Sequence, residues 1–158
     1  MSQTSQATAQ LKVKHKSFTY HTGLKWERGT RTGILTSESK PAFRVASPPE
    51  FKGEEGVWTP EDLLVAAIEA CILTTFVAFA LRLNLPVISY NSSAEGLLEF
   101  HEGKYQFTKV FLRPEIVVET ADVIDQAKKA LHDAHEQCLI ANSVRAEIIV
   151  EPVIKVTG

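Results

Sequence analysis

The two cysteines of the chain are the residues best suited to covalent chemistry. Cys71 lies in the middle of an apolar run over residues 59–81, and Cys138 follows 67 residues later, at the end of an amphipathic segment. A cysteine reacts as its thiolate, and a buried structural thiol is usually inert. Chemistry therefore requires that other parts of the chain activate Cys71 and bring Cys138 to it. Without such activation, each thiol is a small apolar packing residue.

The run around Cys71 predicts a long helix. Pro60 and two acidic residues open it, which is typical of a helix start in a soluble protein. Over residues 63–81 the only formal charge is Glu69, so a membrane span has to be considered. A carboxylate near the centre of a span is costly, and the rest of the chain is amphipathic. The sequence therefore favours a helix buried on all sides, at the centre of a large core or of an oligomer.

The composition is typical of a soluble globular protein. Of the 158 residues, 44% are hydrophobic and 23% are charged, and the formal net charge is −2. These values predict one domain over residues 1–158 and give no reason to expect nucleic acid or a membrane as a partner. Two cysteines are too few for a disulfide framework, and residues 1–10 lack the basic start and apolar core of a signal peptide. We expect a cytoplasmic protein with a flexible tail at residues 1–10.

Alternation, turn residues and helical periodicity predict an α+β fold. Strands come first, followed by the Cys71 helix, a long hairpin, a second helix and a final strand, without the βαβ repeats of a parallel sheet. A loop at residues 47–58, rich in proline and glycine, is long enough to be functional. The expected strands are residues 11–22, 24–28, 31–37, 42–46, 87–101, 105–119 and 145–156, and the expected helices are residues 59–81 and 121–138, the second capped by Thr120.

Three segments of the chain resemble one known family. They are Pro-Glu-Asp-Leu-Leu at residues 60–64 with the alanine-rich stretch that leads to Cys71, Ser-Pro-Pro-Glu-Phe-Lys-Gly at residues 47–53, and His-Glu-Gln-Cys at residues 135–138. In these segments the chain is similar to the osmotically inducible and organic hydroperoxide resistance proteins, and the resemblance covers residues 11–156. It implies antiparallel sheets packed around a central buried helix, in an intertwined homodimer with active sites at the subunit interface.

The resemblance also implies an activity and the residues for it. The activity is that of a thiol-dependent peroxidase in stress defence, which reduces organic hydroperoxides to alcohols without a metal or an organic cofactor. Cys71 would be the peroxidatic cysteine and Cys138 the resolving cysteine, and an external dithiol, for instance on a lipoylated protein, would reduce their disulfide. Glu61 matches the acidic residue of the family.

The arginine of the family comes from the early strand–turn region. Arg31 matches it best, and Arg28 is the second choice. Arg44 is less suitable, because alternation places it on the opposite side of its strand from its apolar neighbours.

The residue chemistry agrees with these implied roles. Cys71 lies about ten residues inside its helix, where the helix dipole has little effect. A guanidinium can hold a thiolate and a peroxide oxygen together, and a carboxylate can orient that guanidinium. On one straight helix, Glu61 and Cys71 would lie roughly 15 Å apart, too far to contact the same arginine. Either the helix begins after Glu61, or Glu61 reaches the Cys71 site of the other subunit, and the apolar character of the helix favours the second arrangement.

Other readings stay open at this point. His132, His135 and Cys138 recur every three residues, but their directions spread over roughly 120° of helix, which is wide for one metal ion. A non-catalytic protein that binds a small molecule in the apolar interface pocket is the alternative from another class. Glu69 lies about 200° from Cys71 round the helix and faces away from it. We expect a lysine or arginine across the interface to pair with Glu69. The apolar residues around Cys71 favour alkyl or lipid hydroperoxides over hydrogen peroxide.

Overall fold

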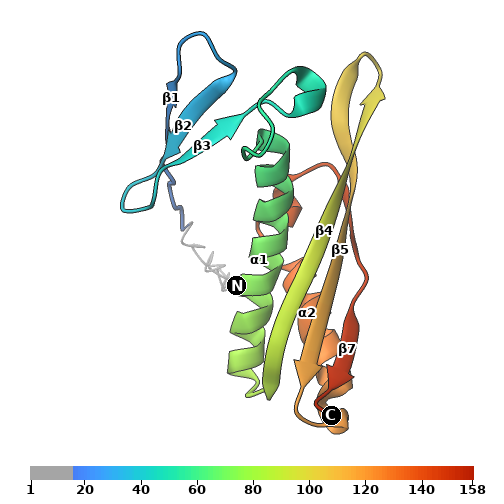
Figure 1. Cartoon of the computed structure of the whole chain (residues 1–158). Helices are drawn as coiled ribbons and strands as arrows, with labels where there is room; N and C mark the ends of the chain where they lie inside the picture. Colours follow the sequence, from blue (N-terminus) through green and yellow to red (C-terminus); the bar gives the residue numbers. More distant parts are fainter. Residues whose placement is uncertain (1–15) are drawn as a thin grey trace, which may run out of the picture.

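The computed structural model describes residues 16–158, which form two sheets and two long helices (Figure 1). α1 runs lengthwise beside a long hairpin, α2 lies behind both, and a small sheet lies beyond the N-terminal end of α1. The α+β class predicted from the sequence is confirmed. In chain order the elements are β1 (Gly23–Trp26), β2 (Thr32–Thr36), β3 (Phe43–Ala46), the 3-10 turn η1 (Pro49–Phe51), α1 (Pro60–Arg82), β4 (Val87–His101), β5 (Lys104–Val118), the 3-10 turn η2 (Ala121–Val123), α2 (Ile124–Glu136), the 3-10 turn η3 (Ala141–Ser143), β6 (Glu147–Val150) and β7 (Val153–Val156).

The sheets differ in how their strands pair. The small sheet has the order β1-β2-β3 and is antiparallel throughout. In the second sheet β5 is central, with β4 antiparallel on one side and with β6 and then β7 parallel on the other. This sheet is therefore mixed, in contrast to the antiparallel sheets that we expected. The reason is that α2 carries the chain back along the sheet before β6 begins, and such a crossover produces a parallel pair.

The expected final strand is divided into β6 and β7 at Pro152. Proline has no backbone N–H and cannot donate to the ladder. The N–H of Glu151, immediately before it, still donates to the carbonyl of Leu112 on β5 (2.8 Å). The chain therefore stays against β5 across the interruption, and both halves of the strand extend the second sheet.

α1 begins with a capping box. The Thr59 hydroxyl accepts from the N–H of Asp62 (3.1 Å), and the Asp62 carboxylate accepts from the N–H of Thr59 (3.0 Å). This exchange satisfies two backbone donors that the first turn leaves free. Because Pro60 opens the helix, Glu61 lies within it, and the alternative in which the helix begins after Glu61 is wrong.

Only one face of α1 is buried within the chain. The buried side chains recur every three or four residues and pack against α2 and the second sheet; they are Ile68, Ile72, Phe76, Phe79 and Ala80. The other face is open, and Leu81 is 74% exposed. By length and composition α1 could span a membrane, but its buried face belongs to the protein core. The helix expected to be buried on all sides is therefore covered on one side by this chain.

α2 carries its apolar residues on one stripe, and it ends close to Cys138. The buried residues are Ala127, Ala130, Leu131 and Ala134, and Cys138 joins the same core cluster just beyond the helix. The segment begins with η2 instead of a full α-helical turn, and Thr120 makes no side-chain cap bond. The helix predicted over residues 121–138 with a Thr120 cap is therefore shorter than expected at both ends.

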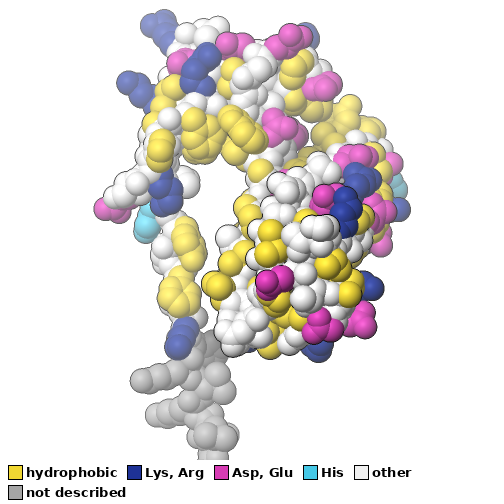
Figure 2. Space-filling model, turned by 60° about the horizontal axis from the view of Figure 1, so that its bottom comes forward, with side chains coloured by type: hydrophobic (Ala, Val, Ile, Leu, Met, Phe, Trp, Pro, Cys, Tyr) yellow, Lys and Arg dark blue, Asp and Glu magenta, His cyan; other side chains and the backbone are white. Residues whose placement is uncertain are grey.

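The strand predicted at residues 11–22 is absent from residues 16–22, and its remaining residues, like the tail at residues 1–10, lie outside the described part of the chain. A strand needs a neighbour for its backbone hydrogen bonds, and no strand among residues 16–158 pairs with residues 16–22. The side chains of Phe18 and Tyr20 are 78% and 87% exposed. Figure 2 shows hydrophobic side chains uncovered on both sides of the open gap between the N-terminal part and the body of the molecule.

Candidate active site

The two cysteines lie together where α1 meets the turn after α2. Cys71 is half-buried on α1 and Cys138 is fully buried (0% exposed). Cys71 packs against the core cluster that contains Cys138, and each thiol alters the pKa of the other, so the two side chains lie close together. The N–H of Ala141 donates to the Cys138 sulfur (3.3 Å) and holds the turn around it. The fold thus brings together two thiols that are 67 residues apart in the sequence.

The surroundings of Cys71 favour its thiolate. Burial raises the pKa of Cys71 and is the largest single effect. It is opposed by the neighbouring Cys138 thiol, the backbone N–H of Ile140, the Thr75 hydroxyl and the backbone N–H of Leu139. These donors together outweigh burial, so the pKa of Cys71 lies below the ordinary value for cysteine. Two of them are backbone groups of the turn that follows Cys138.

Cys138 shows the opposite behaviour. Burial, followed by the interaction with Cys71, raises the pKa of Cys138 to about 11. The N–H groups of Ala141 and Ile140 reduce this rise without cancelling it. At neutral pH, Cys71 is therefore the more ionised thiol of the pair, and Cys138 is a protonated neighbour.

Sequence reasoning missed the groups that lower the pKa of Cys71. Thr75 follows Cys71 by four residues, a spacing that places both on one side of a helix, and this spacing could have identified it. The N–H groups of Leu139 and Ile140 leave no signal in residue types, because every residue except proline carries the same donor.

Arg31 and Glu61 lie away from the thiols of their own chain. Arg31 comes immediately before β2, is exposed, and donates from Nη1 to the carbonyl of Phe51 (2.9 Å). Glu61 lies in the first turn of α1, where its Oε2 is buried without a hydrogen-bond partner in the described structure. These two residues are therefore not brought together with Cys71 within one chain.

Of the other two candidate arginines, Arg28 is exposed and Arg44 is already paired with carboxylates. Arg28 lies exposed in the turn after β1. Arg44 on β3 contacts the carboxylates of Glu54 (2.8 Å) and Glu27 (3.3 Å). Its hydrogen bonds to Glu54 and then Glu27 raise the pKa of Arg44, and the same bond to Arg44 lowers the pKa of Glu54. The guanidinium of Arg44 is thus already engaged by two anions.

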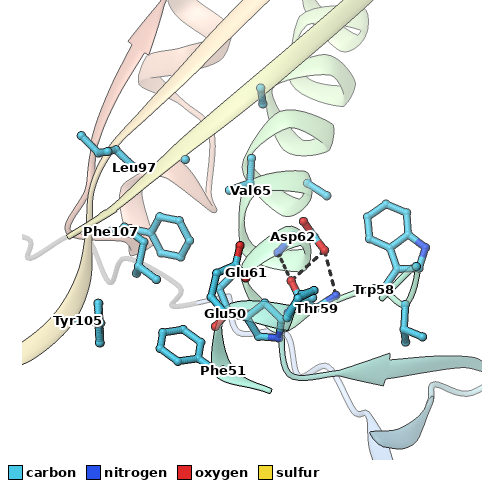
Figure 3. Close-up of a pocket in the computed structure, with 18 of the residues that line it drawn as sticks. Glu50, Phe51, Trp58, Thr59, Glu61, Asp62, Val65, Leu97, Tyr105 and Phe107 are labelled. Carbon is cyan, nitrogen blue, oxygen red and sulfur yellow. Dashed lines mark hydrogen bonds between the residues drawn. The ribbon is translucent and has the colours of Figure 1, made fainter. Parts of the chain in front are cut away.

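A cavity of about 1180 Å³ lies beside the first half of α1, and Glu61 is part of its wall (Figure 3). Figure 3 shows the rings of Phe51, Tyr105 and Phe107 on one side of Glu61 and Trp58 on the other. The cavity is formed by α1, the β4–β5 hairpin and residues 48–59. Neither cysteine lines it. In a single chain, the carboxylate and the thiols therefore belong to different environments.

Glu69 lies in the wall of the same cavity, and its carboxylate accepts a hydrogen bond from the Ser92 hydroxyl on β4. Cys71 is instead directed towards the turn after α2, so the two residues face different sides of α1, as their spacing predicts. Within the chain the partner of Glu69 is a serine hydroxyl. Pairing of Glu69 with a lysine or arginine across an interface stays a prediction.

The histidines near Cys138 do not form a metal centre with it. His132 and His135 border a small surface groove of about 240 Å³, whereas Cys138 is buried beside Cys71. Among residues 16–158 no group of three His, Cys, Asp or Glu side chains is placed to hold a metal ion.

Comparison with known proteins agrees with the fold. A family model described as OsmC-like protein matches residues 53–153. The uncharacterized protein YmaD of Bacillus subtilis (strain 168) is 24% identical over 136 residues, which cover 82% of this chain and 91% of YmaD. The structure of an OsmC-like protein of unknown function from Vibrio cholerae is 27% identical, with a TM-score of 0.80 over 87% of this chain and 100% of that one.

An organic hydroperoxide resistance protein OsmC from Legionella pneumophila has the same fold. Its structure is 22% identical, with a TM-score of 0.68 over 91% of this chain and 100% of that one. The family fold expected from the three sequence segments is confirmed by these comparisons, and the homodimer stays a prediction. The family match covers more than half of the residues, and the chain belongs to the OsmC-like family.

Proposed function

We propose that this protein is a thiol peroxidase that reduces organic hydroperoxides to alcohols with Cys71 and Cys138. The observation that carries the proposal is the proximity of two thiols whose pKa values are moved in opposite directions. A nucleophile needs the lower pKa, and a resolving thiol must lie within reach of it. Similarity to a protein of organic hydroperoxide resistance supports the same chemistry.

The reaction proceeds in three balanced steps. The Cys71 thiolate attacks one peroxide oxygen; an S–O bond forms, the O–O bond breaks, and the alkoxide takes a proton to leave as the alcohol. Cys71 is then a sulfenic acid. The Cys138 sulfur attacks Cys71, an S–S bond forms, and the hydroxyl leaves with the Cys138 proton as water. An external dithiol exchanges with the disulfide, restores both thiols and is itself oxidised to a disulfide.

We propose further that the working form is a homodimer of single-domain chains in the cytoplasm, with each site shared between two subunits. Glu61 lies in a cavity that contains no thiol of its own chain, and its Oε2 lacks a partner. In a shared site, the Glu61 carboxylate accepts hydrogen bonds from Arg31. The Arg31 guanidinium then holds the Cys71 thiolate of the neighbouring subunit together with the peroxide oxygen that this thiolate attacks. The open face of α1 supplies the apolar surface for such an interface.

Peroxide consumption tests the proposal directly. We would supply cumene hydroperoxide with dihydrolipoamide to the wild type, Cys71→Ser and Cys138→Ser. Cys71→Ser is expected to lose turnover. Cys138→Ser is expected to consume one equivalent and to hold a sulfenic acid that dimedone traps. The proposal is overturned if the reduced wild type consumes none of several organic hydroperoxides.

One observation favours a second function, the non-catalytic binding of a small molecule. The cavity of about 1180 Å³ is large enough for an organic ligand, and neither Cys71 nor Cys138 lines it. This function predicts that Cys71→Ser binds its ligand as tightly as the wild type and that neither protein consumes peroxide.

A further inference from the structure

We infer that the cavity beside α1 selects hydroperoxides whose organic part carries no negative charge, and that Glu69 is the residue that imposes this selection. The inference rests on the proposed function, because it concerns which hydroperoxide reaches the shared site. A purely apolar pocket would distinguish substrates by size and shape alone, whereas a pocket with a charged residue in its wall also distinguishes them by charge.

The cavity wall is strongly acidic. It contains five carboxylates and no lysine, arginine or histidine; the five are Glu50, Glu54, Glu61, Asp62 and Glu69. Two of these are already compensated, since Asp62 belongs to the capping box of α1 and Glu54 is paired with Arg44. The other three have no ion pair with a basic side chain of residues 16–158.

Among these three, Glu69 is the carboxylate whose negative charge no basic group compensates in the proposed shared site. Glu50 is exposed at the edge, where water screens its charge. Glu61 gains a cation from Arg31 in the shared site proposed above. Glu69 is partly buried, and the Ser92 hydroxyl fixes the direction of its carboxylate without supplying a charge. Within residues 16–158 a single uncompensated negative charge therefore remains near the middle of α1. Pairing of Glu69 with a basic residue across the interface, the alternative expected from the sequence, would cancel this charge, and the substrate comparison below distinguishes the two arrangements.

The charge of Glu69 also acts on Tyr90, which lies outside the cavity wall. Burial is the main cause that raises the pKa of Tyr90 to about 12, and the charge of Glu69 adds a smaller contribution. A second anion in the cavity would be disfavoured by Glu69 as well, because like charges repel.

The rest of the wall suits an uncharged aryl or alkyl group. Phe51 and Tyr105 meet edge to face with ring centroids 5.3 Å apart, and Trp58, Phe107 and Leu97 complete an apolar lining. Figure 3 shows these side chains on either side of Glu61. A hydrophobic tail therefore gains contacts here, whereas a tail that ends in a free carboxylate brings repulsion into the same space.

A matched pair of substrates isolates the charge from the shape. We would compare cumene hydroperoxide bearing a para-carboxylate with its methyl ester, using the kcat/KM of the wild type and of Glu69→Gln. Glutamine keeps the oxygen that accepts from Ser92 and removes only the charge. The wild type is expected to prefer the ester about tenfold or more, and Glu69→Gln to remove most of this preference by improving the acid. Glu147→Gln, an exposed position on β6 outside the cavity, makes the same change in net charge and is expected to leave the ratio unchanged.

The outcomes separate this inference from the proposed function. Consumption of both substrates at equal rates, with a ratio that Glu69→Gln does not alter, overturns the inference and leaves the peroxidase intact. Consumption of neither substrate overturns the proposed function. In that case, each of the two corresponding alcohols is added to the protein in a Trp26→Phe background, and its binding is followed by the fluorescence of Trp58. Selection by charge is upheld only if the alcohol with the ester group binds more tightly than the alcohol with the carboxylate and Glu69→Gln removes this difference.

Discussion

The thiolate of Cys71 depends on single hydrogen-bond donors, and Thr75 is the side chain among them that can be changed without disturbing the fold. Thr75→Val keeps the shape of the residue and removes the hydroxyl that stabilises the thiolate. Loss of a donor to the charged form favours the protonated form, so the pKa of Cys71 is expected to rise. The measurement is the pH midpoint of Cys71 alkylation by iodoacetamide, followed by mass spectrometry of the Cys71 peptide.

Thr74 provides a matched control for this change. Its hydroxyl donates to the carbonyls of Ala70 (3.0 Å) and Cys71 (3.1 Å) instead of a sulfur. Thr74→Val should therefore leave the alkylation midpoint where it is in the wild type. Equal midpoints for both variants would show that the Thr75 hydroxyl does not act on the thiolate.

Cys138 predicts a pH dependence of stability with a definite sign. Its pKa in the folded chain is about 11, above the value of about 8.5 for a free cysteine, so folding favours the protonated thiol. The stability that this preference contributes is complete below pH 8.5 and is lost as pH rises towards 11. Urea unfolding of the reduced protein from pH 8 to 10.5 should show the wild type losing stability relative to Cys138→Ala. A constant difference between the two would contradict the raised pKa.

The contact between α1 and β4 leaves no room for a side chain at Gly96. A Cβ there would lie 2.6 Å from Val65 Cγ2 and 2.7 Å from Phe107 Cε1. Neither group is the end of a flexible side chain, so α1 or the hairpin must move, and Gly96→Ala is expected to lower the free energy of unfolding by about 1–3 kcal/mol. Urea denaturation measures the loss. Ser93→Ala, on the exposed side of the same strand, should cost much less, and equal losses would argue against the tight contact.

Elements with a strong local pattern could be predicted from the sequence. The helix expected at residues 59–81 is α1, and the expected hairpin is β4 and β5, because proline, acidic and glycine residues mark their ends. The parallel pairing of β6 and β7 could not be predicted, since the path of α2 decides it. The strand expected at residues 11–22 is absent from its described part, residues 16–22, because alternation describes a face of a strand but not the partner that completes it.

In the candidate site too, features that depend on local sequence could be predicted, whereas features that depend on the packing of distant segments could not. Cys71 and Cys138 could be chosen as a pair because they are the only cysteines of the chain. The separation of Glu61 from Cys71 followed from helix geometry alone. The acidic wall that Glu61 and Glu69 share was not predicted, since a cavity is formed by segments distant in sequence, here α1, the hairpin and residues 48–59.

The whole molecule leaves much apolar surface uncovered. Leu81 on the open face of α1 and Phe18 and Tyr20 on residues 16–22 are among its exposed hydrophobic side chains. Apolar surface of this kind is characteristic of an interface. A second copy of the chain is the partner that the proposed function requires, because it would cover α1 and bring a thiol to the cavity that holds Glu61.

Mixed dimers test whether each site is shared. In Cys71→Ser every site lacks its nucleophile, and in Glu61→Ala every site lacks the carboxylate that orients the arginine. If the sites are shared, a dimer of one chain of each kind has one complete site, formed by Cys71 of the Glu61→Ala chain and Glu61 of the Cys71→Ser chain. Random assortment makes half of the dimers mixed, so refolding the two variants together should restore about one quarter of wild-type turnover. Each variant refolded alone is the control, and a mixture no more active than the sum of these controls would place Cys71 and Glu61 in a site formed by a single chain.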